Sequence, residues 1–223
     1  MAEFEIKIEV KSPIHLGSGQ ADVNIDSEFV HDALGFPYFP AKRFKGLLYE
    51  SAVEVFEMCE LAGIDTNDLA EPEKIFNRNS DDTGNVSDVQ IIVPNFYFKD
   101  FKDYEKTCAE WKYLQKNYPE VFSPTDILNS YSSVRYQTQL ENGIVKDGSF
   151  RNLRVLNAGV EFFGTITVRN ASDGVLNLIA LALKNLSAAG TKRNRGFGHI
   201  TCTATCDKSS TSKLIEKFLK KAV

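Results

Sequence analysis

The residues best suited to bind an anion lie near the C-terminus, in residues 190–198, where three cations lie among three glycines. The cations are Lys192, Arg193 and Arg195. Glycine lets backbone N–H groups approach an anion closely, and flanking cations add positive charge. The GxxxxGK[ST] order of a P-loop is absent, so this is a different kind of phosphate loop or an ordinary turn with solvated cations.

A second group of cations, Lys42, Arg43 and Lys45, follows the aromatic turn formed by residues 36–40. These cations lie where a helix is expected to begin. The N-terminus of a helix presents free backbone donors and the positive end of its dipole, both of which attract phosphate. The alternative is an aromatic turn that only packs against a sheet.

Three histidines, His15, His31 and His199, could act as acids or bases near neutral pH. No two of them have the spacing of metal ligands. The four cysteines also lack a CxxC spacing, so we expect them to be reduced packing residues without a disulfide.

Composition limits the class of protein. A chain of 223 residues with 43% hydrophobic residues can bury a substantial core, and a single domain over residues 1–223 is the simplest expectation. No run of about 18 apolar residues and no signal peptide is present, so we expect a cytoplasmic protein without a membrane partner. The net charge of −4 argues mildly against nucleic acid, but the clustered cations predict a basic face on an acidic body.

Hydrophobic periodicity gives the elements that must position these residues. Residues 4–10 alternate like a strand buried on one face, and apolar spacing from Phe44 to Cys59 predicts a helix. Strands are expected near residues 89–98, 160–168 and 199–206, with helices over 175–189 and 213–221. The order predicts an α+β fold of the RRM or ferredoxin-like kind, with an insertion over about 64–133 that contains a short helix.

The polar stretch 135–151 is centred on Asn142-Gly143, a strong signal for a tight hairpin turn. Few of its residues are apolar enough to attach it to a core. We therefore expect a protruding β-hairpin over about 134–153, with Arg135 on its first strand.

An ordered set of motifs resembles the RAMP superfamily, in particular the repeated backbone subunit of type III CRISPR-Cas effector complexes. The motifs are Ser-Pro-Ile-His-Leu-Gly-Ser-Gly at 12–19, Asp26, Gly-Phe-Pro-Tyr-Phe-Pro at 35–40, Phe-Lys-Gly at 44–46 and the glycine-rich segment 190–198. The resemblance covers the opening third and the closing quarter of the chain. At 40–46 the chain reads Pro-Ala-Lys-Arg-Phe-Lys-Gly where the family usually has Pro-Gly-Ser-Ser-Leu-Lys-Gly, which leaves the subunit type open.

The resemblance implies an antiviral ribonucleoprotein subunit with guide RNA, complementary target RNA, other effector subunits and further copies of itself as partners. It implies a thumb hairpin that separates guide from target at regular steps, with Arg135, Asn142 and Gly143 in it. The residues implied to bind RNA are His15, Gly17, Ser18, Lys42, Arg43, Lys45, Lys192, Arg193 and Arg195.

The resemblance also implies a catalytic position. Asp26 matches the acidic residue of members that cleave target RNA, where it could hold Mg²⁺ or orient a ribose 2′-OH for attack on its own phosphate. Asp22, Glu28 and Asp32 are nearby alternatives, and Asp26 could instead only cap a turn. Two other functions stay open: a guide-processing endoribonuclease that uses a histidine base without metal, and a capping subunit that cuts nothing.

Overall fold

The alternating residues at the start of the chain form the central strand of the main sheet. In the computed structural model, which describes residues 1–21, 25–76, 88–99, 101–207 and 209–222, β1 (Ala2–Val10) lies between β9 (Glu161–Arg169) and β10 (Ile200–Cys206). All three pairings in this part of the sheet, including β11 (Ser209–Ser210) on β10, are antiparallel.

The far edge of the sheet is built from short strands. β4 (Phe96–Tyr97) joins β9 to β2 (Tyr38–Phe39), and β3 (Gln90–Ile92) pairs separately with β9. The strand predicted over residues 89–98 is interrupted around Pro94, between β3 and β4. Proline has no N–H to donate to a neighbouring strand. The strand order β10-β1-β9-β4, with helices between them in the sequence, is ferredoxin-like and confirms the predicted fold class.

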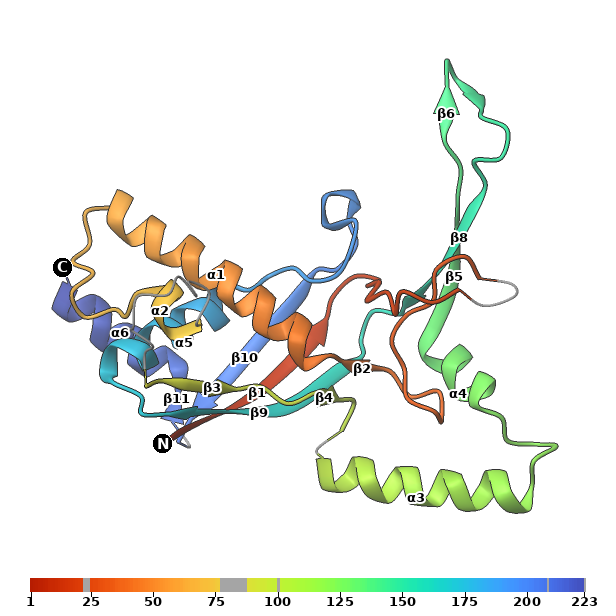
Figure 1. The fold of residues 1–223 in the computed structure, drawn as a ribbon, viewed down its shortest axis with the longest axis horizontal. Helices are drawn as coiled ribbons and strands as arrows, with labels where there is room; N and C mark the ends of the chain where they lie inside the picture. Colours follow the sequence, from red (N-terminus) through yellow and green to blue (C-terminus); the bar gives the residue numbers. More distant parts are fainter. Residues whose placement is uncertain (22–24, 77–87, 100, 208, 223) are drawn as a thin grey trace.

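Four helices lie on the same side of this sheet in Figure 1: α1 (Ala41–Leu61), α2 (Pro72–Phe76), α5 (Asp173–Asn185) and α6 (Thr211–Ala222). The apolar face predicted for α1 is the face that is buried, from Phe44 to Cys59. α5 ends four residues earlier than periodicity predicts. The reason is that Ser187 and Ala189 instead exchange backbone hydrogen bonds with Ile200 and Gly198 and lead into β10.

The insertion is more structured than the sequence indicates. Two helices form in place of one short one: α3 (Phe101–Asn117) and α4 (Pro124–Tyr131), the latter begun by a Ser123 capping box with Asp126. Tyr104 of α3 and Ile127 of α4 pack with Leu34 and Phe36 in a small apolar cluster separate from the main core. Within the range 64–133, β3 and β4 belong to the main sheet and α2 packs into the main core. The inserted part is therefore residues 101–131.

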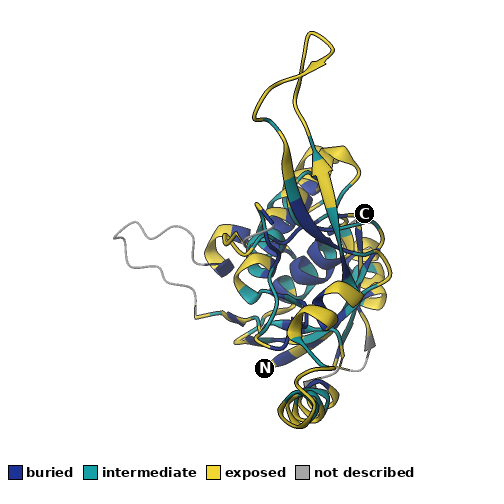
Figure 2. Ribbon diagram, turned by 90° about the vertical axis from the view of Figure 1, so that its right-hand side faces the viewer, coloured by how far each residue is buried: buried dark blue, intermediate teal, exposed yellow. Residues whose placement is uncertain are grey.

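The predicted hairpin is present and projects from the body. Its base pairs β5 (Ser132–Gln137) with β8 (Arg151–Leu156), and its tip pairs β6 (Leu140–Glu141) with β7 (Ile144–Val145). Asn142 and Gly143 both have positive φ, 53° and 82°, as a two-residue hairpin turn requires. Figure 2 shows a buried base and an exposed tip.

All four cysteines are free, three of them buried and Cys108 half-buried. Within the described residues, the structure contains no helix with the length and apolarity needed to cross a membrane.

Candidate functional site

The glycine-rich loop packs against the segment that follows β1. Thr191 N–H donates to the His15 carbonyl at 3.1 Å, and Gly198 N–H donates to the Pro13 carbonyl at 2.9 Å. Gly190 has a φ of 81°, and a Cβ there would lie 2.6 Å from the His15 carbonyl oxygen. Only glycine permits this approach, so the loop and the His15 segment form one surface.

Lys192 stands at the centre of that loop. Its backbone is left-handed, with φ 61° and ψ 31°, a conformation that a residue with a side chain adopts rarely. The Lys192 ammonium donates to the side-chain carbonyl of Gln137 at the end of β5. Burial lowers the pKa of Lys192, and the positive charge of Arg195 acts in the same direction.

The other two loop cations remain on the surface. Arg193 and Arg195 lie in a short 3₁₀ turn (Arg193–Arg195) and are exposed. Arg193 Nη1 is 3.8 Å from Glu50 Oε2, an exposed pair that contributes little. Both guanidinium groups are therefore available to an anion from solvent.

His15 is buried and hydrogen-bonded through both ring nitrogens. Nδ1 lies 2.7 Å from the Arg154 carbonyl oxygen and Nε2 lies 3.0 Å from Ser27 Oγ. Burial lowers the pKa of His15, and the charges of Arg43 and Lys192 add to this effect. A Cβ on Gly17 would lie 2.8 Å from Nε2, so the chain closes tightly over the ring.

Asp26 is exposed and is held by a reciprocal pair of hydrogen bonds to the base of the hairpin. Its backbone N–H donates to Asn152 Oδ1 at 2.7 Å, and its Oδ2 accepts the Asn152 backbone N–H at 2.8 Å. Among the described residues, its other oxygen, Oδ1, accepts no hydrogen bond. That oxygen is free to face a ligand.

These groups converge on one pocket of about 520 Å³. It is lined by His15, Asp26, Ser27, Gln137, Arg151, Asn152, Leu153, Thr191 and Lys192. A neighbouring hollow of about 680 Å³ runs up the hairpin and adds Lys146 and Arg195. The loop, the Asp26 segment and the hairpin base thus form a continuous polar surface with a carboxylate and several cations.

The cations at the start of α1 divide into two sets. Lys42 is exposed, and the Arg43 guanidinium donates to the Gly17 carbonyl, next to the pocket. Lys45 is half-buried, and its ammonium is directed to the Ile91 carbonyl of β3 at 3.4 Å. The structure therefore brings Arg43 to the site and turns Lys45 away from it.

The remaining predicted residues have local roles. Ser18 Oγ donates to the Glu28 carbonyl at 3.1 Å and shapes the loop. His31 Nδ1 is 2.8 Å from the Asp32 carbonyl oxygen, whereas His199 is exposed immediately before β10. In the hairpin, Arg135 is exposed on β5, and Asn142 and Gly143 form the tip, away from the pocket.

The acidic alternatives to Asp26 that can be described serve the fold. Glu28 is buried and pairs with Arg154, with Nε 3.1 Å from Oε1. Asp32 accepts the backbone N–H groups of Leu34 and Phe36 and the Tyr104 hydroxyl, the last at 2.6 Å. Asp22 lies outside the described residues.

The described residues contain no group of three or more His, Cys, Asp or Glu side chains that could hold a metal alone. Mg²⁺ is often bound through one or two carboxylates, with water and substrate phosphate completing its shell. Asp26, with one carboxylate oxygen open, fits that mode of binding and not an all-protein cage.

Sequence reasoning missed Gln137, Asn152, Ser27 and Thr191. Each is an uncharged polar residue, with no pattern that separates it from its neighbours. Their roles come from the pairing of β5 with β8 and from the approach of two loops. Asp26 and Asn152, for example, are more than 100 residues apart in the sequence.

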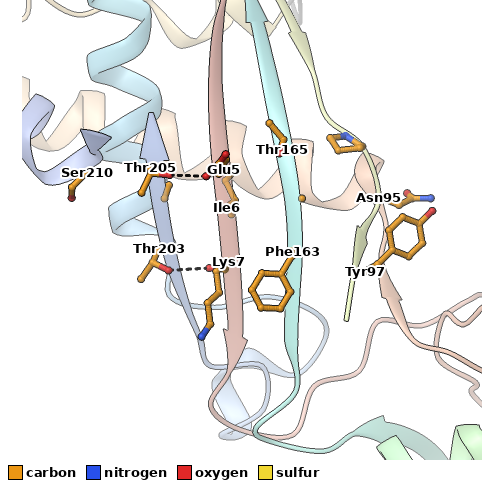
Figure 3. A pocket seen from close by; sticks show the side chains of 13 residues that line it. Glu5, Ile6, Lys7, Asn95, Tyr97, Phe163, Thr165, Thr203, Thr205 and Ser210 are labelled. Atoms are coloured by element: carbon orange, nitrogen blue, oxygen red, sulfur yellow. Dashed lines mark hydrogen bonds between the residues drawn. The ribbon is translucent and has the colours of Figure 1, made fainter. Parts of the chain in front are cut away.

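A larger hollow, of about 830 Å³, lies elsewhere, on the open face of the main sheet (Figure 3). Among the described residues that line it, Lys7 is the one cation, and its ammonium is 2.6 Å from Glu161 and 5.9 Å from the Phe163 ring centroid. With Glu5 also in the lining, this face offers little to an anion. The polar pocket beside Lys192 is the better candidate.

A family profile described as RAMP superfamily matches residues 7–201. This range includes every residue that lines the pocket. The chain belongs to the RAMP superfamily. Among curated proteins, no sequence matches this RAMP protein.

Solved structures share the fold of this RAMP protein. One, from the type III-B Cmr-beta bound to cognate target RNA, has a TM-score of 0.61 at 13% identity and covers 96% of this chain and 99% of that chain. Another, from type III-B Cmr-beta in the apo state, has a TM-score of 0.60 at 13% identity, with coverages of 91% and 97%. At this identity the likeness concerns the fold.

Proposed function

We propose that this RAMP protein is a guide-RNA-binding backbone subunit of a type III CRISPR effector complex and cleaves complementary target RNA at the pocket that contains Asp26. The observation that carries the proposal is the convergence of the glycine-rich loop, the Asp26 segment and the hairpin base on one pocket. The overlap of nearly the whole chain with a chain of Cmr-beta bound to target RNA supports the assembly.

Guide binding would use the cations around the pocket and the exposed surface of the hairpin. Arg43, Lys192, Arg193 and Arg195 supply charge for phosphates, which is independent of base sequence. Tyr136 and Phe150 form a stacked pair on the hairpin, with ring centroids 5.5 Å apart, and both are more than half exposed. Exposed rings of this kind can stack on splayed bases.

Cleavage would use Asp26. Its open oxygen could accept a hydrogen bond from a ribose 2′-OH and orient it for in-line attack on the adjacent phosphorus. As the 2′ oxygen bonds to phosphorus, its proton would pass to Asp26 and the bond from phosphorus to the 5′ oxygen of the next nucleotide would break. That oxygen would take a proton from water, leaving a 2′,3′-cyclic phosphate and a 5′-OH. A divalent cation held by Asp26 and the phosphate would supply charge stabilisation at the reacting phosphate.

The geometry favours this over the histidine-based processing enzyme. A histidine base needs a nitrogen open to the substrate, and both nitrogens of His15 are engaged with Arg154 and Ser27 in a buried site. His199 is exposed but does not line the pocket. The non-catalytic capping subunit is the remaining alternative, and the same experiment distinguishes it.

The test is cleavage of a complementary RNA by the assembled complex in Mg²⁺. Asp26→Ala and Asp26→Asn should each lower the cleavage rate by at least about 100-fold while guide affinity stays within about twofold, because an exposed carboxylate contributes little to the fold. Asp103→Ala, at an exposed aspartate of α3, is the matched control and should cut normally.

Three outcomes separate the alternatives. Loss of cutting on addition of a chelator supports the metal-assisted reaction. Cutting of guide precursor with chelator present indicates the processing enzyme. A wild-type complex that binds target and never cuts it indicates a scaffold.

A further inference from the structure

The base of the hairpin contacts both charged groups of the pocket, although neither group belongs to the hairpin. Asp26 comes from the loop after β1, and Lys192 comes from the loop after α5. Asn152 of β8 holds the first, with bonds of 2.7 and 2.8 Å, and Gln137 of β5 accepts the Lys192 ammonium. The two polar residues are therefore the link between two distant segments.

Gln137 and Asn152 occupy adjacent rungs of one ladder. In the β5–β8 pairing, Gln137 lies opposite Arg151, and Tyr136 lies opposite Asn152. The ladder continues without a break to Ser132 and Leu156, where its residues are buried against the body. A paired two-stranded base of this kind restricts the relative movement of the two side chains.

The Asp26 segment pairs with β8 much as an additional strand would. Ser27 pairs with Leu153 in a parallel bridge, and the Arg154 N–H donates to the Ser27 carbonyl at 3.1 Å. The buried Glu28–Arg154 ion pair fixes the next position. Any shift of β8 must therefore move the Asp26 backbone with it.

Lys192 is held in a conformation that needs support. Its left-handed backbone is unfavourable for a residue with a side chain, and such conformations persist where the surroundings fix them. Burial also lowers the pKa of its ammonium. Gln137 supplies a hydrogen-bond acceptor for the Lys192 ammonium and so holds this side chain in place.

We propose that Asn152 and Gln137 are positioning residues: they fix the Asp26 carboxylate and the Lys192 ammonium around one pocket, so that the placement of the hairpin sets the geometry of the reacting groups. The inference rests on the proposed cleavage function. Asp26 would orient the attacking hydroxyl, and Lys192 would stabilise the negative charge that develops on the phosphate oxygens. Asn152 and Gln137 themselves gain or lose no bond or proton in the reaction proposed above.

The first test needs no activity. In Asn152→Ala the Asp26 N–H loses its acceptor, so amide exchange at residue 26, followed by NMR on the full chain, should be faster than in the wild type. The Arg154 N–H bond to Ser27 is unchanged and should keep its exchange rate. Asn152→Asp retains an acceptor oxygen and should restore slow exchange at residue 26.

The second test is the single-turnover cleavage rate of the assembled complex. Asn152→Ala and Gln137→Ala should each lower the rate about tenfold or more, with guide and target affinity within about twofold, since small misplacements of reacting groups are costly. Gln137→Glu keeps the acceptor for Lys192 and should recover most of the rate.

Matched controls are Asn157→Ala, whose side chain bonds Ser133 at the other end of the hairpin base, and Gln90→Ala on β3. Both should cut at the wild-type rate. Equal rates for wild type, Asn152→Ala and Gln137→Ala overturn the positioning proposal and leave the cleavage proposal standing. A wild-type complex that does not cut overturns both.

Discussion

Burial decides what each charged or titratable residue around the pocket does. Glu28 and Arg154 are 7% and 8% exposed and pair with each other, so they stabilise the base of the hairpin, and removal of one partner would leave an uncompensated buried charge. Asp26, two residues before Glu28, is exposed and keeps one oxygen open. An acidic residue thus stabilises the fold at position 28, whereas the carboxylate at position 26 is left for the proposed reaction.

His15 makes the stability of the folded chain depend on pH. Because burial lowers its pKa, the folded chain binds a proton at His15 less readily than the unfolded chain, whose histidine titrates near about 6.5. The stability contributed by neutral His15 is therefore complete above about pH 7 and is lost as the pH falls below about 6.5.

We expect His15→Gln to lower the free energy of unfolding at pH 7.5 by about 1–3 kcal/mol, since buried partners lose hydrogen bonds. Its stability should also fall less than that of the wild type between pH 7.5 and 5.5. Urea unfolding at several pH values measures both. The exposed His199→Gln is the control, and a His15→Gln profile parallel to that of the wild type would contradict the assignment.

At the scale of elements, the glycine-rich loop and the hairpin meet through two different kinds of contact. Backbone hydrogen bonds fix the loop to residues 13–15, and side-chain contacts through Gln137 join it to β5. The cations of the loop are therefore presented from a fixed backbone, which suits repeated contact with a phosphate chain.

We predict that a variant with Lys192→Ala, Arg193→Ala and Arg195→Ala binds guide RNA more weakly and with a shallower salt dependence. Each lost phosphate contact reduces the slope of log affinity against log salt by about 0.7 for single-stranded nucleic acid. Fluorescence anisotropy from about 50 to 200 mM salt measures the slope. The α6 triple variant Lys213→Ala, Lys217→Ala and Lys220→Ala carries the same charge change, and a slope no shallower than that of this control would remove the loop from the site.

The hairpin itself should show two levels of protection in the free protein. We expect slow amide exchange in the buried rungs of β5 and β8 and fast exchange across residues 138–150, whose side chains are largely exposed. Binding of RNA or a neighbouring subunit should slow exchange at the tip. Strong protection of residues 138–150 in the isolated chain would contradict this prediction.

The whole molecule has two unlike surfaces. The open face of the sheet carries Glu5 and Lys7 (Figure 3), and Lys7 is already paired with Glu161. The cationic pocket lies where the glycine-rich loop, the Asp26 segment and the hairpin base meet. A net charge of −4 is therefore compatible with a site for RNA, because several cations gather around this pocket.

If copies of the chain stack along a guide, the size of the assembly should follow RNA length. We predict that native mass spectrometry with guides of increasing length shows complexes that grow in steps of one 25.0 kDa chain plus the added nucleotides. Variants with the loop triple substitution should need more protein to reach the same size. Binding of a single copy irrespective of RNA length would contradict a repeated backbone subunit.

The sequence alone determined the core elements and several of the site's segments. Period-two and helical spacing depend on local burial, so β1, α1, β9 and β10 could be read directly, and Asn142-Gly143 specified the hairpin turn. The glycines at 190 and 198 marked a loop that makes close backbone contacts. The extent of α3 and α4 could not be read, because their packing with Phe36 joins segments far apart in the chain.

Only the tertiary structure decided how the site is assembled. It placed Arg43 beside the pocket and Lys45 away from it, although both lie in one turn of α1, because neighbouring residues on a helix point in different directions. It also separated exposed Asp26 from buried Glu28. The contacts of Asn152 and Gln137 arise when two loops meet one strand pair, and such long-range contacts leave no local pattern in the sequence.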